Sequence, residues 1–217
     1  GRYLSEPVEK PVQFSDLRRQ YRRYGVSADV FTQFLADRRR FDAVLIQTSM
    51  TYWYPGVQET IRELRKVFPS VPIVLGGIYA SLCPSHAEDH SGADAIVTGP
   101  CEFRILDIIS QYTGFSVPPV IDPEDLDTLP YPALDLQNNI SFLPILTSRG
   151  CPFSCAYCAS AYLSPRRQRR KPEKIIEEIT FWHRRYGVRD IAFYDDALLV
   201  DAEIHAAILF ERIIESG

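Results

Sequence analysis

Short apolar runs alternate with helical patterns along most of the chain, and this alternation favours an α/β architecture. Apolar stretches typical of buried strands lie at residues 42–48, 71–77 and 92–99, and helical patterns follow at 57–68 and 102–112. Strands separated by helices of this length form a parallel sheet, and ligands bind beyond the carboxyl ends of its strands. The sequence therefore predicts a Rossmann-like domain with a ligand-binding edge.

A second α/β pattern begins near residue 141. It predicts a strand at 142–148, a helix from Pro172 to Gly187, a strand at 190–196 and a helix at 201–215.

Residues 114–140 separate the two patterns, contain five prolines and show no clear periodicity, which is typical of an extended connection. We therefore expect a first domain at 1–113, a linker at 114–140 and a second domain at 141–217. Residues 1–40 predict helices at 14–25 and 27–40 and no convincing strand.

The composition of the chain argues against several classes of protein. The net charge of −4 argues against a nucleic-acid-binding surface. No run of about 20 apolar residues is present, so we expect no membrane span. Three of the five cysteines are clustered, unlike a secreted disulfide framework, and we expect a cytoplasmic protein.

The cysteine cluster is the strongest chemical signal. Cys151, Cys155 and Cys158 have the spacing C-x3-C-x2-C in "TSRGCPFSCAYCAS". A structural zinc site normally takes four ligands, and no fourth cysteine or histidine is near. A [4Fe-4S] cluster fits better, because three thiolates leave one iron open to a small-molecule ligand. Zinc, and three ordinary cysteines on a βα loop, remain the alternatives.

This motif, directly after the first strand of an α/β domain, resembles the signature of radical S-adenosylmethionine (SAM) enzymes, in particular the subgroup with an N-terminal cobalamin-binding domain. The resemblance implies that each cysteine holds one iron and that SAM chelates the fourth. Tyr157 would then lie against the adenine. Reductive cleavage of SAM would give methionine and a 5′-deoxyadenosyl radical, with electrons from a donor such as flavodoxin or ferredoxin.

The second half resembles the family beyond its cysteines. The strand at 190–196 ends in Tyr194, Asp195 and Asp196, the place that faces the SAM amine in the family. Alternatively, Asp196 or Asp201 caps the following helix. The basic segment, residues 166–171, is expected to be a solvated rim, with binding of an anionic group as the alternative.

The first half resembles the cobalamin-binding domain through "VLIQTSM", "YPG" and "VPIVLGG". Gly76 and Gly77 end a strand, where they would permit close approach of a flat ligand. The other expected cofactor-binding residues at strand ends are Ser49, Thr51 and Gly99. The Asp-x-His-x-x-Gly motif that supplies a cobalt-ligating histidine is absent, so the use of cobalamin stays open.

The resemblance covers residues 41–217 and implies a Rossmann-like sheet followed by the first strand–helix units of a partial TIM barrel. Because family members have further strands at both ends, we expect a fragment that is inactive alone and whose exposed strand edge favours self-association. The substrate, a small molecule or a peptide, and the choice between methyl transfer and rearrangement stay open. The competing classes are a Rossmann-like binding module with a structural or electron-transfer cluster, and a zinc-stabilised interaction protein.

Overall fold

The computed structural model describes residues 4–37, 41–116, 118 and 121–215. The chain divides into two compact units, Gly1–Thr98 and Gly99–Gly217. The boundary between the units lies before the domain limit that was expected after residue 113. Helix α5 (Ile105–Thr113) therefore belongs to the second unit. The functional domain limits themselves stay a prediction.

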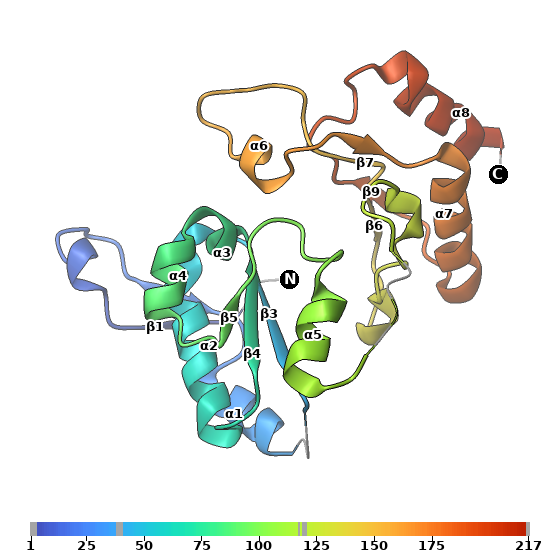
Figure 1. The fold of residues 1–217 in the computed structure, drawn as a ribbon. Coiled ribbons are helices and arrows are strands. Elements are labelled where there is room, and N and C mark those ends of the chain that lie inside the picture. The colour runs from blue at the N-terminus through green and yellow to red at the C-terminus, as the bar shows by residue number, and fades with distance from the viewer. Residues whose placement is uncertain (1–3, 38–40, 117, 119–120, 216–217) are drawn as a thin grey trace. The chain divides into compact units, whose positions relative to one another are not determined.

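The first unit is built on a three-stranded parallel sheet in the order β3-β4-β5 (Figure 1). Its strands are β3 (Val44–Thr48), β4 (Ile73–Gly77) and β5 (Ala95–Ile96). In the register of the sheet, Thr48 lies opposite Gly77. The carboxyl ends of β3 and β4 therefore meet at one edge, where ligands of such sheets bind.

The helices of the first unit pack on this sheet through two buried apolar clusters. One contains Leu35, Ile61, Leu64 and Ile73, and the other contains Leu75, Tyr79, Ala80 and Ala87. The helices are α1 (Ala28–Ala36), η2 (Thr51–Trp53), α2 (Tyr54–Val67), α3 (Ile78–Leu82) and α4 (Pro84–His90). The predicted helix at 57–68 thus corresponds to α2.

A hairpin replaces the helix predicted at 14–25, and that prediction is wrong. Strands β1 (Ser5–Pro7) and β2 (Arg22–Tyr24) pair antiparallel, with the short helix η1 (Val12–Phe14) between them. The Arg23 guanidinium also forms an ion pair with Glu59 on α2 at 2.7 Å. Pairing with a distant strand overrides the helical pattern of this arginine-rich stretch. The second predicted helix is α1, and residues 38–40 lie outside the described residues.

The second unit contains a pair of parallel strands and a pair of antiparallel strands. The parallel strands are β6 (Leu143–Ile145) and β9 (Ile191–Phe193), and the antiparallel strands are β7 (Ser148–Arg149) and β8 (Gln168–Arg169). The helices are α5 (Ile105–Thr113), η3 (Leu126–Thr128), η4 (Leu134–Leu136), α6 (Ser160–Leu163), α7 (Pro172–Tyr186), η5 (Ala202–Ile204) and α8 (Ala206–Glu215).

Helix α7 covers the parallel pair and has clear sequence signals at both ends. Pro172 occupies the first turn, where its missing N–H needs no partner, and Gly187 ends the helix in the left-handed conformation. The side chains of Ile175 and Trp182 are buried. These signals explain why the limits of this helix predicted from the sequence agree with those of α7.

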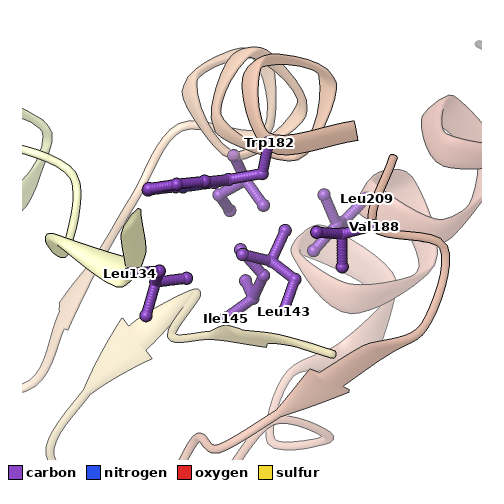
Figure 2. Packing of buried hydrophobic residues seen from close by; sticks show 7 residues of the cluster. Leu134, Leu143, Ile145, Trp182, Val188 and Leu209 are labelled. Atoms are coloured by element: carbon purple, nitrogen blue, oxygen red, sulfur yellow. The ribbon is translucent and has the colours of Figure 1, made fainter. Parts of the chain in front are cut away.

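The core of the second unit draws on the proline-rich segment. Figure 2 shows Leu134, from η4 in that segment, beside Leu143 and Ile145 of β6 and Trp182 of α7. Residues 114–140 were expected to be an extended connection, yet Leu126 and Leu134 are both buried. Apolar side chains at turns of the segment fasten it to the second unit.

The α/β architecture with parallel strands, predicted from the sequence, is confirmed. In the part of the chain that the structure describes, no helix has the length and apolar character required to cross a bilayer.

Candidate cofactor site

The cysteine loop, residues 150–167, leaves from β7 and returns along β8. Ser148 pairs with Arg169 across these strands, so the loop is closed at its base. Gly150 has a φ of +82°, and a Cβ there would lie 2.5 Å from the carbonyl oxygen of Arg166. Only glycine permits this approach, because a side chain would overlap the returning backbone. Sequence reasoning missed this role of Gly150, although its place before the first cysteine was a signal.

Three thiols are exposed to different extents on this loop. Cys151 is half-buried, Cys155 and Cys158 are exposed, and none forms a disulfide. Among the described residues, no group of three or more His, Cys, Asp or Glu side chains is arranged to hold a metal ion. The structure therefore places the three cysteines on one loop without gathering their sulfur atoms, and their role as cluster ligands stays a prediction.

The chemistry of the donor set fits an iron–sulfur cluster. Thiolates are the ligands of such clusters, and Cys158 is biased toward this form. A hydrogen bond with the Ser160 hydroxyl, with Sγ and Oγ 3.2 Å apart, lowers the pKa of the Cys158 thiol, and the nearby charge of Asp196 opposes this shift. Asp196 therefore lies close enough to the cysteine loop to act on it electrostatically.

Asp195 is occupied by hydrogen bonds to the start of the cysteine loop. Its carboxylate accepts from the Thr147 backbone N–H at 3.1 Å, from the Thr147 hydroxyl at 2.8 Å and from the Ser148 hydroxyl at 2.6 Å. Asp195 thus joins the end of β9 to the segment between β6 and β7. Its role in this structure is to position the loop.

Thr147 also joins a buried histidine to this network. Its Oγ1 lies 2.8 Å from His205 Nε2, and because the hydroxyl donates to Asp195, the oxygen accepts from an Nε2–H. Burial lowers the pKa of His205, with help from Arg169 and Arg167 and against the charge of Asp195. The neutral imidazole is therefore the form that this network holds. Sequence reasoning singled out neither Thr147 nor His205.

Asp196 and two tyrosines are the more accessible members of the predicted SAM site. Asp196 is exposed, and so are Tyr194 and Tyr157, the latter with 93% of its surface accessible. The Tyr194 ring stacks on Phe142 with centroids 6.4 Å apart. Asp196 and Tyr194 thus lie in the segment after β9, and Tyr157 lies in the cysteine loop. The assignment of these residues to SAM binding stays a prediction.

The basic segment is held by ion pairs rather than standing free as a solvated rim. The pairs are Arg166–Glu124, Arg167–Asp201, Arg169–Asp201, Arg170–Asp127, Arg170–Glu178 and Lys171–Asp125. Three of these carboxylates belong to the acidic segment, residues 122–127, in the proline-rich part of the chain. The acidic segment therefore holds the returning end of the cysteine loop.

Asp201 does not cap the helix that follows it, and that alternative is wrong. Its side chain makes no capping hydrogen bond, and the helix-starting position belongs to Asp201 rather than to Asp196. Hydrogen bonds from Arg167 and then Arg169 lower the pKa of Asp201.

At the ligand edge of the first unit, the close approach of two backbone segments explains why residue 77 is a glycine. Gly77 has a φ of +90°, and a Cβ there would lie 2.2 Å from the carbonyl oxygen of Thr48. The Thr48 hydroxyl donates to the Gly76 carbonyl at 2.7 Å, which fixes the two strand ends together. A glycine is thus required at position 77 because the backbone there approaches β3 closely. The sequence alone instead favours a flat ligand as the reason.

The remaining residues expected to bind a cofactor lie after the strands. Ser49 is exposed and Thr51 is half-buried at the start of η2. A Cβ on Gly76 would meet only the Val97 carbonyl at 3.7 Å, and one on Gly99 would meet nothing within 4 Å. These positions leave space beyond the strand ends, and their contact with a cofactor stays a prediction.

Comparisons with known proteins show which proteins this chain resembles. Residues 16–106 match the family described as the B12 binding domain. The fold resembles a radical SAM methyltransferase, TsrM, from Kitasatospora setae, solved with cobalamin and a [4Fe-4S] cluster. The TM-score is 0.63 at 17% identity, over 87% of this chain and 44% of that one. The predicted resemblance to B12-binding domains is confirmed by the family match, and the predicted resemblance to radical SAM proteins is confirmed at the level of the fold.

Individual relatives are methyltransferases by name. An uncharacterized methyltransferase of Pyrococcus horikoshii is 25% identical, over 75% of this chain and 42% of the relative. The cytidylyl-2-hydroxyethylphosphonate methyltransferase of Streptomyces wedmorensis is 22% identical, over 100% of this chain and 49% of that protein. The chain thus spans less than half the length of these two relatives.

Proposed function

We propose that the chain carries the cofactor-binding part of a cobalamin-dependent radical SAM methyltransferase. The observation that carries this proposal is a closed loop with three free thiols, which follows β6 in a chain whose first half matches the B12 binding domain. Four relatives have methyltransferase names and a fifth is named as a cyclase of magnesium-protoporphyrin IX monomethyl ester; the four names favour methyl transfer over rearrangement.

In this proposal, Cys151, Cys155 and Cys158 hold three irons of a [4Fe-4S] cluster as thiolates. When bound, the cluster supplies the electron that cleaves SAM to methionine and a 5′-deoxyadenosyl radical. The chain's own contribution is to orient the loop and to favour the thiolate form of Cys158. The Ser160 hydroxyl serves the second purpose, because its hydrogen bond lowers the pKa of that thiol.

Asp196 is the carboxylate that we assign to the SAM amine. Asp195 is saturated by donors from Thr147 and Ser148, whereas Asp196 is exposed and acts electrostatically on Cys158. A carboxylate near the amine stabilises its positive charge. Tyr157 provides an exposed aromatic face for the adenine, and Tyr194 a second one.

The strand ends of the first unit are assigned to cobalamin, which when bound supplies a methyl carrier. Gly76 and Gly77 place no side chain there, and Ser49 and Thr51 add hydroxyl groups that can hydrogen-bond to a polar cofactor periphery. Gly99, at the start of the second unit, likewise carries no side chain. The absence of side chains at the glycines suits a broad, flat ligand.

The test is anaerobic reconstitution of the protein, expressed over its whole natural length, with iron and sulfide. We expect about four irons per chain, and loss of most iron in Cys151→Ala, Cys155→Ala and Cys158→Ala. Cys83→Ala and Cys101→Ala are the matched controls. Equal iron loss from all five variants would overturn the assignment of the loop.

The reconstituted protein then distinguishes an enzyme from a binding module. With dithionite and SAM, we expect 5′-deoxyadenosine, and with hydroxocobalamin, a saturable change in the corrin spectrum. A stable cluster that produces no 5′-deoxyadenosine would favour the structural or electron-transfer role. No spectral change at millimolar cobalamin would assign the first unit a purely structural role.

A further inference from the structure

An ion pair reaches the residue two positions before the first cysteine of the loop. Arg149 Nη2 donates to Glu102 Oε1 at 2.6 Å, and the two side chains are 17% and 38% exposed. Arg149 Nη1 and Glu102 Oε2 are buried and have no hydrogen-bond partner within the described residues. Arg149 therefore depends on Glu102, because loss of this carboxylate would leave the largely buried guanidinium unpaired.

Both ends of this ion pair stand on constrained backbone. Arg149 belongs to β7, where it pairs with Gln168, and the close approach of Gly150 to Arg166 follows at once. On the other side, the Cys101 carbonyl accepts hydrogen bonds at 2.9 and 2.8 Å from the backbone N–H groups of residues 104 and 105. Glu102 thus lies in a hydrogen-bonded turn that starts α5. Because the backbone is constrained around both residues, a displacement of either side chain would also shift the backbone that carries it.

The charges of this pair act on their surroundings. Burial raises the pKa of the Cys101 thiol, the charge of Glu102 raises it further, and Arg149 opposes the shift. Both charges are thus felt by a neighbouring sulfur. A charge near an iron–sulfur cluster also changes its reduction potential, because reduction adds negative charge.

We propose that Glu102 is a positioning residue for the cysteine loop: it fixes Arg149, and with it the position of Cys151, and it neutralises the positive charge that Arg149 carries two residues before this first cluster ligand. The inference rests on the proposed function, since it concerns the cluster assigned to the loop. Glu102 also lies within residues 16–106, which match the B12 binding domain. The ion pair therefore fastens the end of that match to the entry of the cluster loop.

The test compares variants of the reconstituted, full-length protein by iron content and by the midpoint potential of the cluster. Glu102→Gln leaves the Arg149 cation without a counter-charge, so we expect a more positive midpoint potential and a lower iron content. The double variant Glu102→Gln/Arg149→Gln removes both charges, and its potential should return toward that of the wild type. Glu102→Asp keeps the charge and should also lie closer to the wild type.

Glu173→Gln is the matched control, because it removes one carboxylate from an ion pair with Arg212 in the same unit. It should leave the potential unchanged. If circular dichroism shows that Glu102→Gln is unfolded, the double variant tests the positioning role in its place, because it leaves no unpaired buried charge.

An unchanged potential and iron content in Glu102→Gln, or an equal shift in Glu173→Gln, would overturn the inference and leave the proposed function standing. If only the double variant folds, an iron content below that of the wild type supports the positioning role, and wild-type iron content and loop protection from hydrogen exchange overturn it. A wild-type protein that takes up no cluster would overturn both proposals.

Discussion

The Arg170 guanidinium donates to the Glu178 carboxylate at 2.6 Å inside the second unit, where the two side chains are 13% and 3% exposed. The same guanidinium donates to Asp127 at 3.2 Å and to the Leu146 carbonyl at 3.2 Å. One arginine, directly after β8, thus connects the acidic segment, α7 and the residue that follows β6. Because these charges are almost fully removed from water, each needs its partners.

The first prediction concerns this buried network. Glu178→Gln should lower the free energy of unfolding by about 3 kcal/mol, because Arg170 keeps only Asp127 as a charged partner. Urea denaturation followed by circular dichroism measures the change. Glu177→Gln, which removes an exposed partner of Lys174 on the same helix, is the control and should change stability little. Equal effects of both variants would contradict the role of burial.

The second prediction concerns the close approach of Gly77 to Thr48. Gly77→Ala should destabilise the first unit by about 3 kcal/mol or more, because its backbone conformation (φ +90°, ψ −163°) is almost confined to glycine and the new Cβ would overlap Thr48. Gly56→Ala is the matched control. It lies in α2 with open space around it and should stabilise the helix by about 0.5–1 kcal/mol. Thermal unfolding of both variants measures the difference.

The third prediction is a loss of stability in mild acid that depends on His205. The folded pKa of His205 is lowered, chiefly by burial, so below the ordinary histidine pKa of about 6.5 the unfolded chain binds a proton that the folded chain does not. The free energy of unfolding should therefore fall as pH decreases from about 6.5 to the lowered folded pKa. Denaturation between pH 7.5 and 5 measures this slope.

His205→Gln should flatten the slope, because glutamine does not titrate. His90→Gln, at an exposed histidine of α4, should leave it unchanged. The charged groups that act on His205 are Arg169, Arg167 and Asp195. A slope that persists in His205→Gln would contradict the prediction.

The fourth prediction separates the two adjacent aspartates. Asp196→Asn should weaken SAM binding by roughly tenfold or more, the effect of removing one charge-assisted hydrogen bond, while the unfolding curve stays that of the wild type. Asp195→Asn should instead destabilise the second unit, because it loses acceptors for Thr147 and Ser148. Equilibrium dialysis with SAM and urea denaturation measure the two effects. The opposite pattern would reverse the assignment.

Local patterns in the sequence determined much of this protein. The alternation of apolar runs and helical patterns predicted the parallel strands, Pro172 and Gly187 marked the ends of α7, and the spacing of the cysteines identified the loop. Each of these signals resides in a few consecutive residues, because helix ends, strand burial and ligand spacing are set by neighbouring positions.

Only the tertiary structure decided which residues serve which purpose. Asp195 and Asp196 are chemically identical neighbours, but only Asp195 meets Thr147 and Ser148, whereas Asp196 begins the turn after β9 and is exposed. The hairpin of β1 and β2 and the pairing of the acidic with the basic segment likewise depend on contacts between distant parts of the chain. Such contacts form only when the fold brings their partners together, and no local pattern in the sequence encodes them.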